Sequence, residues 1–188
     1  VSRRQYTLQF KDLNSGELLP DNIINTTGQA VWAADSKTLF YISKDPETLR
    51  AARVMMHVLG TPASEDRVVF DETDETFAVQ LRKTKSKKYI TIVSDQTLTS
   101  EVRLIEAANP TGGVKVFEPR KVDHLYSVEH LNGTFYIHTN ADGAKNFKLM
   151  SCPENKTDMA SWKEVIPHRP DVLLENFEYL TAILLPMS

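Results

Sequence analysis

Cysteine is almost absent from this sequence, and so are the long apolar runs that membrane proteins need. The one cysteine, Cys152, cannot form a disulfide within the chain, which fits a reducing compartment and predicts a cytoplasmic protein. No stretch approaches the roughly 20 consecutive apolar residues of a membrane-spanning helix, and no pattern of a secretory signal opens the chain. We therefore expect no membrane partner.

The sequence also lacks an excess of positive charge. Its 22 lysines and arginines stand against 25 aspartates and glutamates, a formal net charge of −3, whereas nucleic-acid-binding domains carry basic patches or stripes. The one dense basic segment, 83–88, has no interleaved aromatic residue, so we interpret it as a solvated turn. A nucleic-acid partner is not expected.

Recognisable catalytic and metal-binding motifs are missing as well. There is no Gly-x-Ser-x-Gly elbow, and serine, histidine and aspartate do not stand at spacings that assemble a triad. The histidines are scattered, without His-Glu-x-x-His or Cys-x-x-Cys. His130 and His138 could meet across one hairpin, but two ligands do not make a metal site. Cys152 is interpreted as an unreactive thiol. We expect no catalytic residue, cofactor or metal, and no enzymatic activity from this chain alone.

Short segments that alternate apolar and polar residues are abundant, and this period of two predicts β-strands. Three of them share one pattern, a polar turn followed by an apolar strand, at 36–42, 86–92 and 132–137. They begin 50 and then 46 residues apart, and each is preceded by one short strand and followed by two more. Four strands in a repeat of this length predict the blades of a β-propeller.

The repeat divides the chain into three whole blades and parts of two others. We predict an all-β fold, a partial propeller of four-stranded antiparallel blades. The divisions expected are 1–21 as outer strands of one blade, 28–71, 76–118 and 124–167 as whole blades, and 172–188 as inner strands of the next. A two-sheet sandwich, which also uses short strands and turns, is the alternative.

Helix signals are nearly absent, and the best of them, 46–53, is interpreted as a loop that enters a strand. The inner strands of the predicted blades carry aromatic residues, where neighbouring blade faces pack together. We expect all four of these residues in the core: Trp32, Phe40, Tyr89 and Phe135.

Acidic residues gather in loops that the blade topology places on one rim. In a propeller, the loop that leads to the next blade shares a rim with the loop between the second and third strands. The carboxylates expected there are Asp45, Glu47, Asp71, Glu72, Asp74, Glu75 and Asp95. Their summed field could steer cationic ligands toward this opening. The plain alternative is that these side chains are merely solvated.

Several segments, in one order along the chain, resemble the oligopeptidase B branch of the prolyl oligopeptidase family of serine peptidases. None of the segments is a catalytic motif. They are Ser2–Tyr6, Val31–Ser36, Gly60–Asp66, Thr99–Leu104, Asp123–Ser127, Lys145–Phe147 and Trp162–Pro167.

The resemblance implies a seven-bladed propeller, of which this chain supplies about half, capping an α/β-hydrolase domain. It implies cleavage of short peptides after arginine or lysine, with the propeller excluding folded proteins. The family's catalytic serine, aspartate and histidine lie in the hydrolase domain, so none is carried over to this chain. The implied partners are that hydrolase domain, the remaining blades and short basic peptides.

A stand-alone propeller that serves as a protein-interaction scaffold is the alternative function. The sequence that follows the chain would separate the two, because a peptidase continues into more blades and a nucleophile elbow. Both ends of the chain fall at strand patterns, so we expect a piece of a longer protein. Its uncovered blade faces and strand edges predict self-association.

Overall fold

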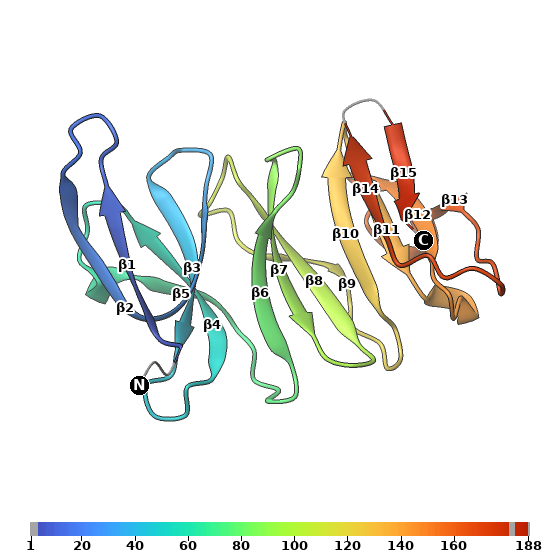
Figure 1. The fold of residues 1–188 in the computed structure, drawn as a ribbon, viewed down its shortest axis with the longest axis horizontal. Helices are drawn as coiled ribbons and strands as arrows, with labels where there is room; N and C mark the ends of the chain where they lie inside the picture. The colour runs from blue at the N-terminus through green and yellow to red at the C-terminus, as the bar shows by residue number, and fades with distance from the viewer. Residues whose placement is uncertain (1–3, 181–182, 188) are drawn as a thin grey trace. The chain divides into compact units, whose positions relative to one another are not determined.

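The computed structural model describes residues 4–180 and 183–187, and its regular structure is almost entirely β. Within each sheet the strands are antiparallel and follow one another in chain order (Figure 1). This meander is the connectivity of a propeller blade, and it confirms the predicted fold class. The segment 46–53 is a turn that leads into a strand, as expected.

The strands are grouped into a five-stranded sheet, two four-stranded sheets and a two-stranded sheet. The first sheet contains β1 (Tyr6–Lys11), β2 (Leu18–Trp32), β3 (Thr38–Lys44), β4 (Ala51–Val58) and β5 (Arg67–Asp71). The second contains β6 (Ala78–Lys83), β7 (Tyr89–Asp95), β8 (Ser100–Glu106) and β9 (Lys115–Glu118). The third contains β10 (Tyr126–Leu131), β11 (Thr134–Thr139), β12 (Lys148–Pro153) and β13 (Lys163–Ile166), and the last contains β14 (Asn176–Leu180) and β15 (Ile183–Met187). Short 3₁₀ turns are η1 (Ala63–Glu65), η2 (Ala141–Gly143) and η3 (Met159–Ser161).

The chain forms two compact units, and each is described by itself. The first unit comprises the residues up to Lys83 together with Lys87–Ser94 and Arg103–Lys115. The second unit comprises Thr84–Ser86, Asp95–Val102 and the residues from Val116 onward.

The first sheet differs from the division expected at residue 21. Strand β2 runs without interruption through this position and pairs first with β1, as Leu8↔Ile23, and then with β3, as Trp32↔Leu39. Positive φ angles at Asn25 (56°) and Gly28 (82°) let the strand bend where it changes partners. The pair expected to belong to a preceding blade is therefore hydrogen-bonded into the same sheet.

The bounds of the other predicted blades agree closely with the bounds of observed sheets. The second sheet spans 78–118 and the third spans 126–166, against expected blades of 76–118 and 124–167. In the third sheet, Asn132 and Gly133 connect the paired residues Leu131 and Thr134 with φ angles of 51° and 76°, the geometry of a two-residue type I′ hairpin. The segment expected as 172–188 contains β14 and β15, and its residues 181, 182 and 188 lie outside the described residues.

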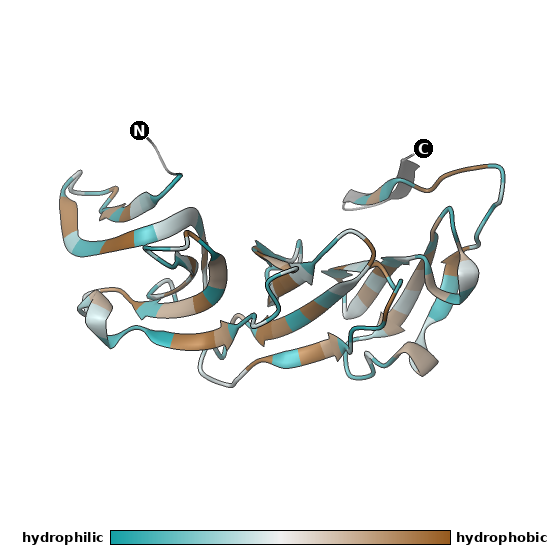
Figure 2. Ribbon diagram, turned by 90° about the horizontal axis from the view of Figure 1, so that it is seen from below, coloured by the Kyte–Doolittle hydropathy of each residue, from teal (hydrophilic) through white to brown (hydrophobic). Residues whose placement is uncertain are grey.

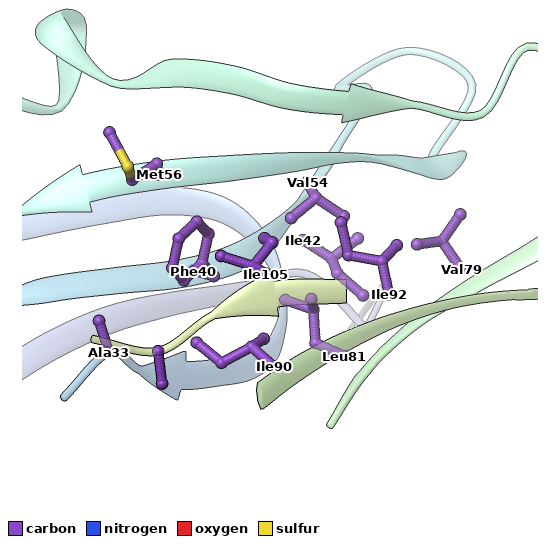
Figure 3. Close-up of a cluster of buried hydrophobic side chains, with 11 residues drawn as sticks. Ala33, Phe40, Ile42, Val54, Met56, Val79, Leu81, Ile90, Ile92 and Ile105 are labelled. Carbon is purple, nitrogen blue, oxygen red and sulfur yellow. The ribbon is translucent and has the colours of Figure 1, made fainter. Parts of the chain in front are cut away.

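The core of the first unit is a cluster of buried apolar side chains, and Figure 2 shows apolar and polar residues interspersed along the strands. Side chains from β3 and β4 meet side chains from β6, β7 and β8 in this cluster (Figure 3). Phe40, Val54, Ile90 and Ile92 are fully buried. Two stacked sheet faces thus share one dry interior.

Three of the four aromatic residues expected in the core are buried: Phe40, Tyr89 and Phe135. Trp32 is not, because 39% of its surface is exposed. Its neighbours Val31 and Ala33 face the cluster, so the strand alternation turns Trp32 to the opposite face. There its indole packs edge-on against the Phe10 ring, with centroids 5.7 Å apart.

These positions give a stability test of the sheet packing. We expect Phe40→Ala to cost roughly 3–5 kcal/mol of unfolding free energy, as other buried aromatic truncations do, and Trp32→Ala to cost less than about 2 kcal/mol because the indole is partly exposed. Chemical denaturation of both variants beside the unsubstituted chain measures the two losses. A larger loss for Trp32→Ala than for Phe40→Ala would contradict the assignment of the two faces.

Candidate functional site

The β3–β4 turn presents the first two residues of the predicted acidic rim. The Asp45 carboxylate accepts backbone N–H bonds from Thr48 at 2.8 Å and Glu47 at 2.9 Å. These bonds, that from Thr48 foremost, hold the pKa of Asp45 below its usual range. Asp45 therefore fixes the shape of the turn, while the Glu47 side chain extends into solvent.

The link between β5 and β6 contains three more of the predicted acidic residues, and they differ in exposure. Glu72 is 3% exposed, and its Oε1 accepts the Asp74 N–H at 3.1 Å. Asp74 in turn accepts the N–H and the hydroxyl of Thr76, at 2.9 and 2.7 Å. Glu75 is exposed. Glu72 therefore does not contribute to an exposed rim, because its side chain is buried.

Two arginines, which the sequence interpretation missed, accompany these carboxylates. The guanidinium of Arg50 donates to the carbonyl oxygens of Glu72 and Asp74, at 2.6 and 2.8 Å, and so connects the β3–β4 turn to the β5–β6 link. Arg53 pairs with Asp71 at 3.0 Å. The signal was present in the sequence, because a β4–β5 meander places Arg53 directly opposite Asp71.

Part of the predicted acidic field is therefore neutralised or buried. Among the described residues, the Glu47 and Glu75 carboxylates have no ion-pair or hydrogen-bond partner. Asp95 ends β7 and belongs to the second unit, whereas the other six residues belong to the first. The steering of cationic ligands stays a hypothesis, carried mainly by Glu47 and Glu75.

A second ionisable cluster, absent from the sequence interpretation, is buried in the first unit. The His57 ring lies between two carboxylates, with Nδ1 2.7 Å from Asp66 Oδ1 and Nε2 3.1 Å from Asp21 Oδ1. All three side chains are at most 2% exposed. The Tyr41 hydroxyl donates to Asp66 at 2.8 Å, and burial, followed by this aspartate, raises the tyrosine pKa. The Phe10 ring stacks on the imidazole.

This cluster is suited to stability rather than to proton transfer. Burial, the largest influence, acts to raise the pKa of Asp21, but N–H bonds from Gly60 and His57 outweigh it and hold that pKa below its usual range. Both ring nitrogens of His57 face carboxylate oxygens, so the imidazole is engaged on both sides within the fold.

The other residues considered from the sequence are held in separate structural contacts. His130 Nδ1 lies 2.8 Å from Ser86 Oγ, whereas His138 Nε2 donates to the Leu174 carbonyl at 2.6 Å and its ring stacks on Phe147. His130 and His138 thus do not meet. No group of three or more potential ligands capable of holding a metal occurs in the described part of the chain.

Cys152 is buried, and desolvation, with a smaller influence of Asp158, raises the pKa of its thiol to about 12. The thiolate that reacts or binds metals is therefore scarce at neutral pH. This agrees with the interpretation of Cys152 as unreactive.

The lysine-rich segment is more than a solvated turn. The Lys85 N–H donates to Glu129 Oε1 at 2.8 Å, and the Ser86 N–H donates to the His130 carbonyl at 3.1 Å. The Lys85 ammonium lies 3.0 Å from Glu178. Residues 84–86 thus dock onto β10 within the second unit.

Across residues 4–180 and 183–187, no helix has the length and apolar character required to cross a membrane.

The repeated four-stranded meanders and their packed apolar faces define a β-propeller domain. The family described as "Prolyl oligopeptidase, N-terminal beta-propeller domain" matches residues 1–185. The chain belongs to this family.

Named relatives of the chain are peptidases. Dipeptidyl aminopeptidase BI of Pseudoxanthomonas mexicana is 47% identical over 94% of this chain, and Protease 2 of Moraxella lacunata is 34% identical over 91%. The chain spans only 24% of the length of either relative.

Solved structures show the same fold. Oligopeptidase B from Leishmania major superimposes with a TM-score of 0.85 at 30% identity, over 93% of this chain and 24% of its own. Oligopeptidase B from Trypanosoma brucei, in a closed form with covalently bound antipain, gives 0.77 at 28% identity, over 85% of this chain and 23% of its own.

The buried cluster of Asp21, His57 and Asp66 gives a second stability test. We expect His57→Leu to cost roughly 3–5 kcal/mol, because it removes the imidazole that lies between two buried carboxylates and leaves each with fewer donors. The exposed substitution Glu17→Gln is the control and should change stability by less than about 0.5 kcal/mol. Urea denaturation measures both. A loss under about 1 kcal/mol for His57→Leu would show that the two carboxylates do not depend on the imidazole.

Proposed function

We propose that this chain is the propeller part of a serine oligopeptidase that cleaves short peptides after arginine or lysine. The family match along almost the whole chain is the observation that carries the proposal. The likeness to oligopeptidase B structures supports the narrower substrate class. In this proposal the propeller caps a hydrolase domain and restricts entry to short peptides, while the chemistry takes place in that domain.

The exposed carboxylates of the first unit support a preference for cationic peptides. Glu47 and Glu75 extend from the β3–β4 turn and the β5–β6 link, two segments that the Arg50 guanidinium holds together. Charges on adjacent loops add their fields, and such a field raises the rate at which oppositely charged substrates arrive. A short peptide with several basic residues is the substrate that benefits most.

A second candidate function is the release of dipeptides from free N-termini. It is favoured by the higher identity to the relative named dipeptidyl aminopeptidase BI than to the one named Protease 2. The scaffold alternative is weaker, because the chain belongs to a family of peptidase domains.

Peptide amides separate the two candidate activities in a protein that carries this chain and its hydrolase domain. An oligopeptidase that cleaves after basic residues should release the reporter from an N-acylated Arg-Arg amide and leave an N-acylated Ala-Ala amide intact. A dipeptidyl aminopeptidase should require the free amine, because it recognises the N-terminus. The 188-residue chain alone should release nothing from either substrate. If the chain alone hydrolysed a substrate and a serine-directed inhibitor abolished that activity, the proposal that the chemistry takes place in the hydrolase domain would be contradicted.

Charge steering is tested by the double substitution Glu47→Gln and Glu75→Gln in the same longer protein. We expect kcat/KM for a substrate with several basic residues to fall roughly two- to fivefold at low salt, with kcat unchanged, because a surface field acts on encounter. The loss should fade near 0.15 M salt, where the screening length is about 8 Å. The control, Glu17→Gln with Glu65→Gln, removes the same charge from other exposed positions. Equal losses in the two variants would rule out a specific rim.

The proposal includes a cytoplasmic location, for which the single cysteine is the support. It also includes self-association of the isolated chain, since strand edges and sheet faces made for neighbouring blades remain available in it.

A further inference from the structure

A cavity of about 350 Å³ lies in the first unit, between strand β5 and the loop that connects β8 to β9. Its volume is at the lower end of the roughly 300–1,000 Å³ that small-molecule sites occupy, so it suits a small ligand. All but two of the residues that line it are apolar, and the exceptions are Arg67 and Thr111. Neither the acidic rim nor the buried His57 cluster contributes a residue to it.

The apolar wall of this cavity is continuous with the core of the first unit. Met56 and Ile105 line the cavity and are also members of the buried apolar cluster (Figure 3). Val69 and Val114 line it as well, and they are partly buried against the same cluster. Val68, at the edge of the cavity, is 53% exposed. An apolar group that entered the cavity would therefore cover side chains that otherwise meet water.

A β-bulge shapes one side of the cavity. Strand β5 pairs with β4 as Val54↔Phe70 and then as Met55↔Val68. Val69 thus has no residue opposite it, and a bulge of this kind bends its strand and interrupts the regular ladder. In the described part of the chain, β5 is the last strand of its sheet. No further strand of that sheet covers its free edge beside the cavity.

A well-defined turn forms the opposite side of the cavity. The Asn109 N–H donates to the Glu106 carbonyl and the Gly112 N–H donates to the Asn109 carbonyl, both at 3.0 Å. A Cβ at position 112 would collide with the Asn109 side chain, so the close approach requires glycine. Gly113 has a φ of 94°, which only glycine adopts readily. This wall is preformed, and a preformed wall lowers the entropic cost of binding.

Arg67 gives the cavity one positive charge that is not compensated. Its guanidinium has no ion-pair or hydrogen-bond partner among the described residues. The preceding residue, Asp66, is buried beside His57, and the Glu106 carboxylate pairs with Lys115 at 3.4 Å. A guanidinium presents paired N–H donors that match the two oxygens of a carboxylate. The cavity therefore combines an apolar wall with a donor for an anion.

We propose that this cavity binds a small aliphatic monocarboxylate. The hydrocarbon chain of the ligand lies against Met56, Val69 and Val114, and its carboxylate pairs with Arg67 at the mouth. The apolar wall alone would accept any hydrophobic molecule. The uncompensated guanidinium selects an acid, because an alcohol or an amine of the same length gains no ion pair. The inference does not depend on the proposed peptidase activity, since it rests on the groups lining this cavity alone.

The test is an NMR titration of the methyl-labelled 188-residue chain with acetate, butanoate and hexanoate. The methyl resonances of Met56, Val69 and Ile105 should move saturably with hexanoate, whereas that of Ile137, which is buried in the second unit, should stay in place. Each methylene added to the ligand should lower Kd roughly fourfold, as burial of one CH₂ group does. Hexanol and hexylamine lack the carboxylate and should bind at least about tenfold more weakly than hexanoate.

Substitutions at exposed positions test the two halves of the site without disturbing the core. Arg67→Gln should weaken hexanoate binding about tenfold or more and leave hexanol binding unchanged, because the guanidinium pairs only with the carboxylate. The control Arg82→Gln, at an exposed arginine outside the cavity, should change neither. Thr111→Phe, at an exposed position of the cavity wall, should weaken both ligands because the larger side chain fills the space.

Four outcomes would overturn the proposal. Equal affinity for acetate and hexanoate would show that an adventitious ion only meets the arginine, and equal affinity for hexanol and hexanoate would show that the charge plays no part. The absence of any saturable methyl shift would show that the cavity stays empty. Tighter binding of N-acetyl-leucine than of hexanoate would assign the cavity to the C-terminus of a peptide instead.

Discussion

The stacking of apolar side chains between two sheet faces is the interaction on which the first unit depends. Side chains of β3 and β4 are buried against those of β6, β7 and β8, and the residues at the centre are excluded from water. Polar contacts reinforce the same packing. The Gln29 side chain accepts the Leu81 N–H and donates to the Leu81 carbonyl, at 3.0 and 2.8 Å, as a strand neighbour would. A meander by itself exposes one apolar face, so burial of that face against a second sheet contributes more to the stability of the unit than the loops do.

The loops that connect the packed sheets carry many carboxylates, and these carboxylates have different structural roles. The Asp45 and Asp74 carboxylates are used to close turns, Asp71 is paired with Arg53, and Asp21 and Asp66 are buried on either side of His57. Only a minority of the carboxylates in these loops can act at long range. The candidate acidic rim is therefore reduced to the polar groups that remain after these structural needs are met, at Glu47 and Glu75.

Much of the fold could be predicted from the sequence, because period-two alternation and turn residues report on local geometry. The strand patterns at 36–42, 86–92 and 132–137 each lie largely within a β-strand, and Asn132-Gly133 forms the hairpin its residue types favour. The continuity of β2 could not be predicted in this way, because Asn25 and Gly28 read as turn residues when no partner strand is known. The prediction for Trp32 was wrong for a related reason. Alternation indicates that a strand has two faces, but it does not indicate which face is buried in the core and which is covered by Phe10 of β1.

The candidate sites were much less visible in the sequence than the strands. Asp21 lies 36 residues from His57, whereas Asp66 lies nine residues from it, and the three meet only because the strands of the first sheet pair. The acidic rim was visible as composition, yet composition alone could not separate the buried Glu72 from the exposed Glu75.

The burial of Cys152 has a practical consequence for following this protein in motion. The one native thiol is shielded and, with its pKa raised to about 12, reacts slowly with alkylating reagents at neutral pH. A cysteine introduced at an exposed loop position would then be the only group to take up a maleimide dye. Fluorophores could thus be attached at single chosen points without first removing a native residue, and energy transfer between them would report how the loops of this chain move.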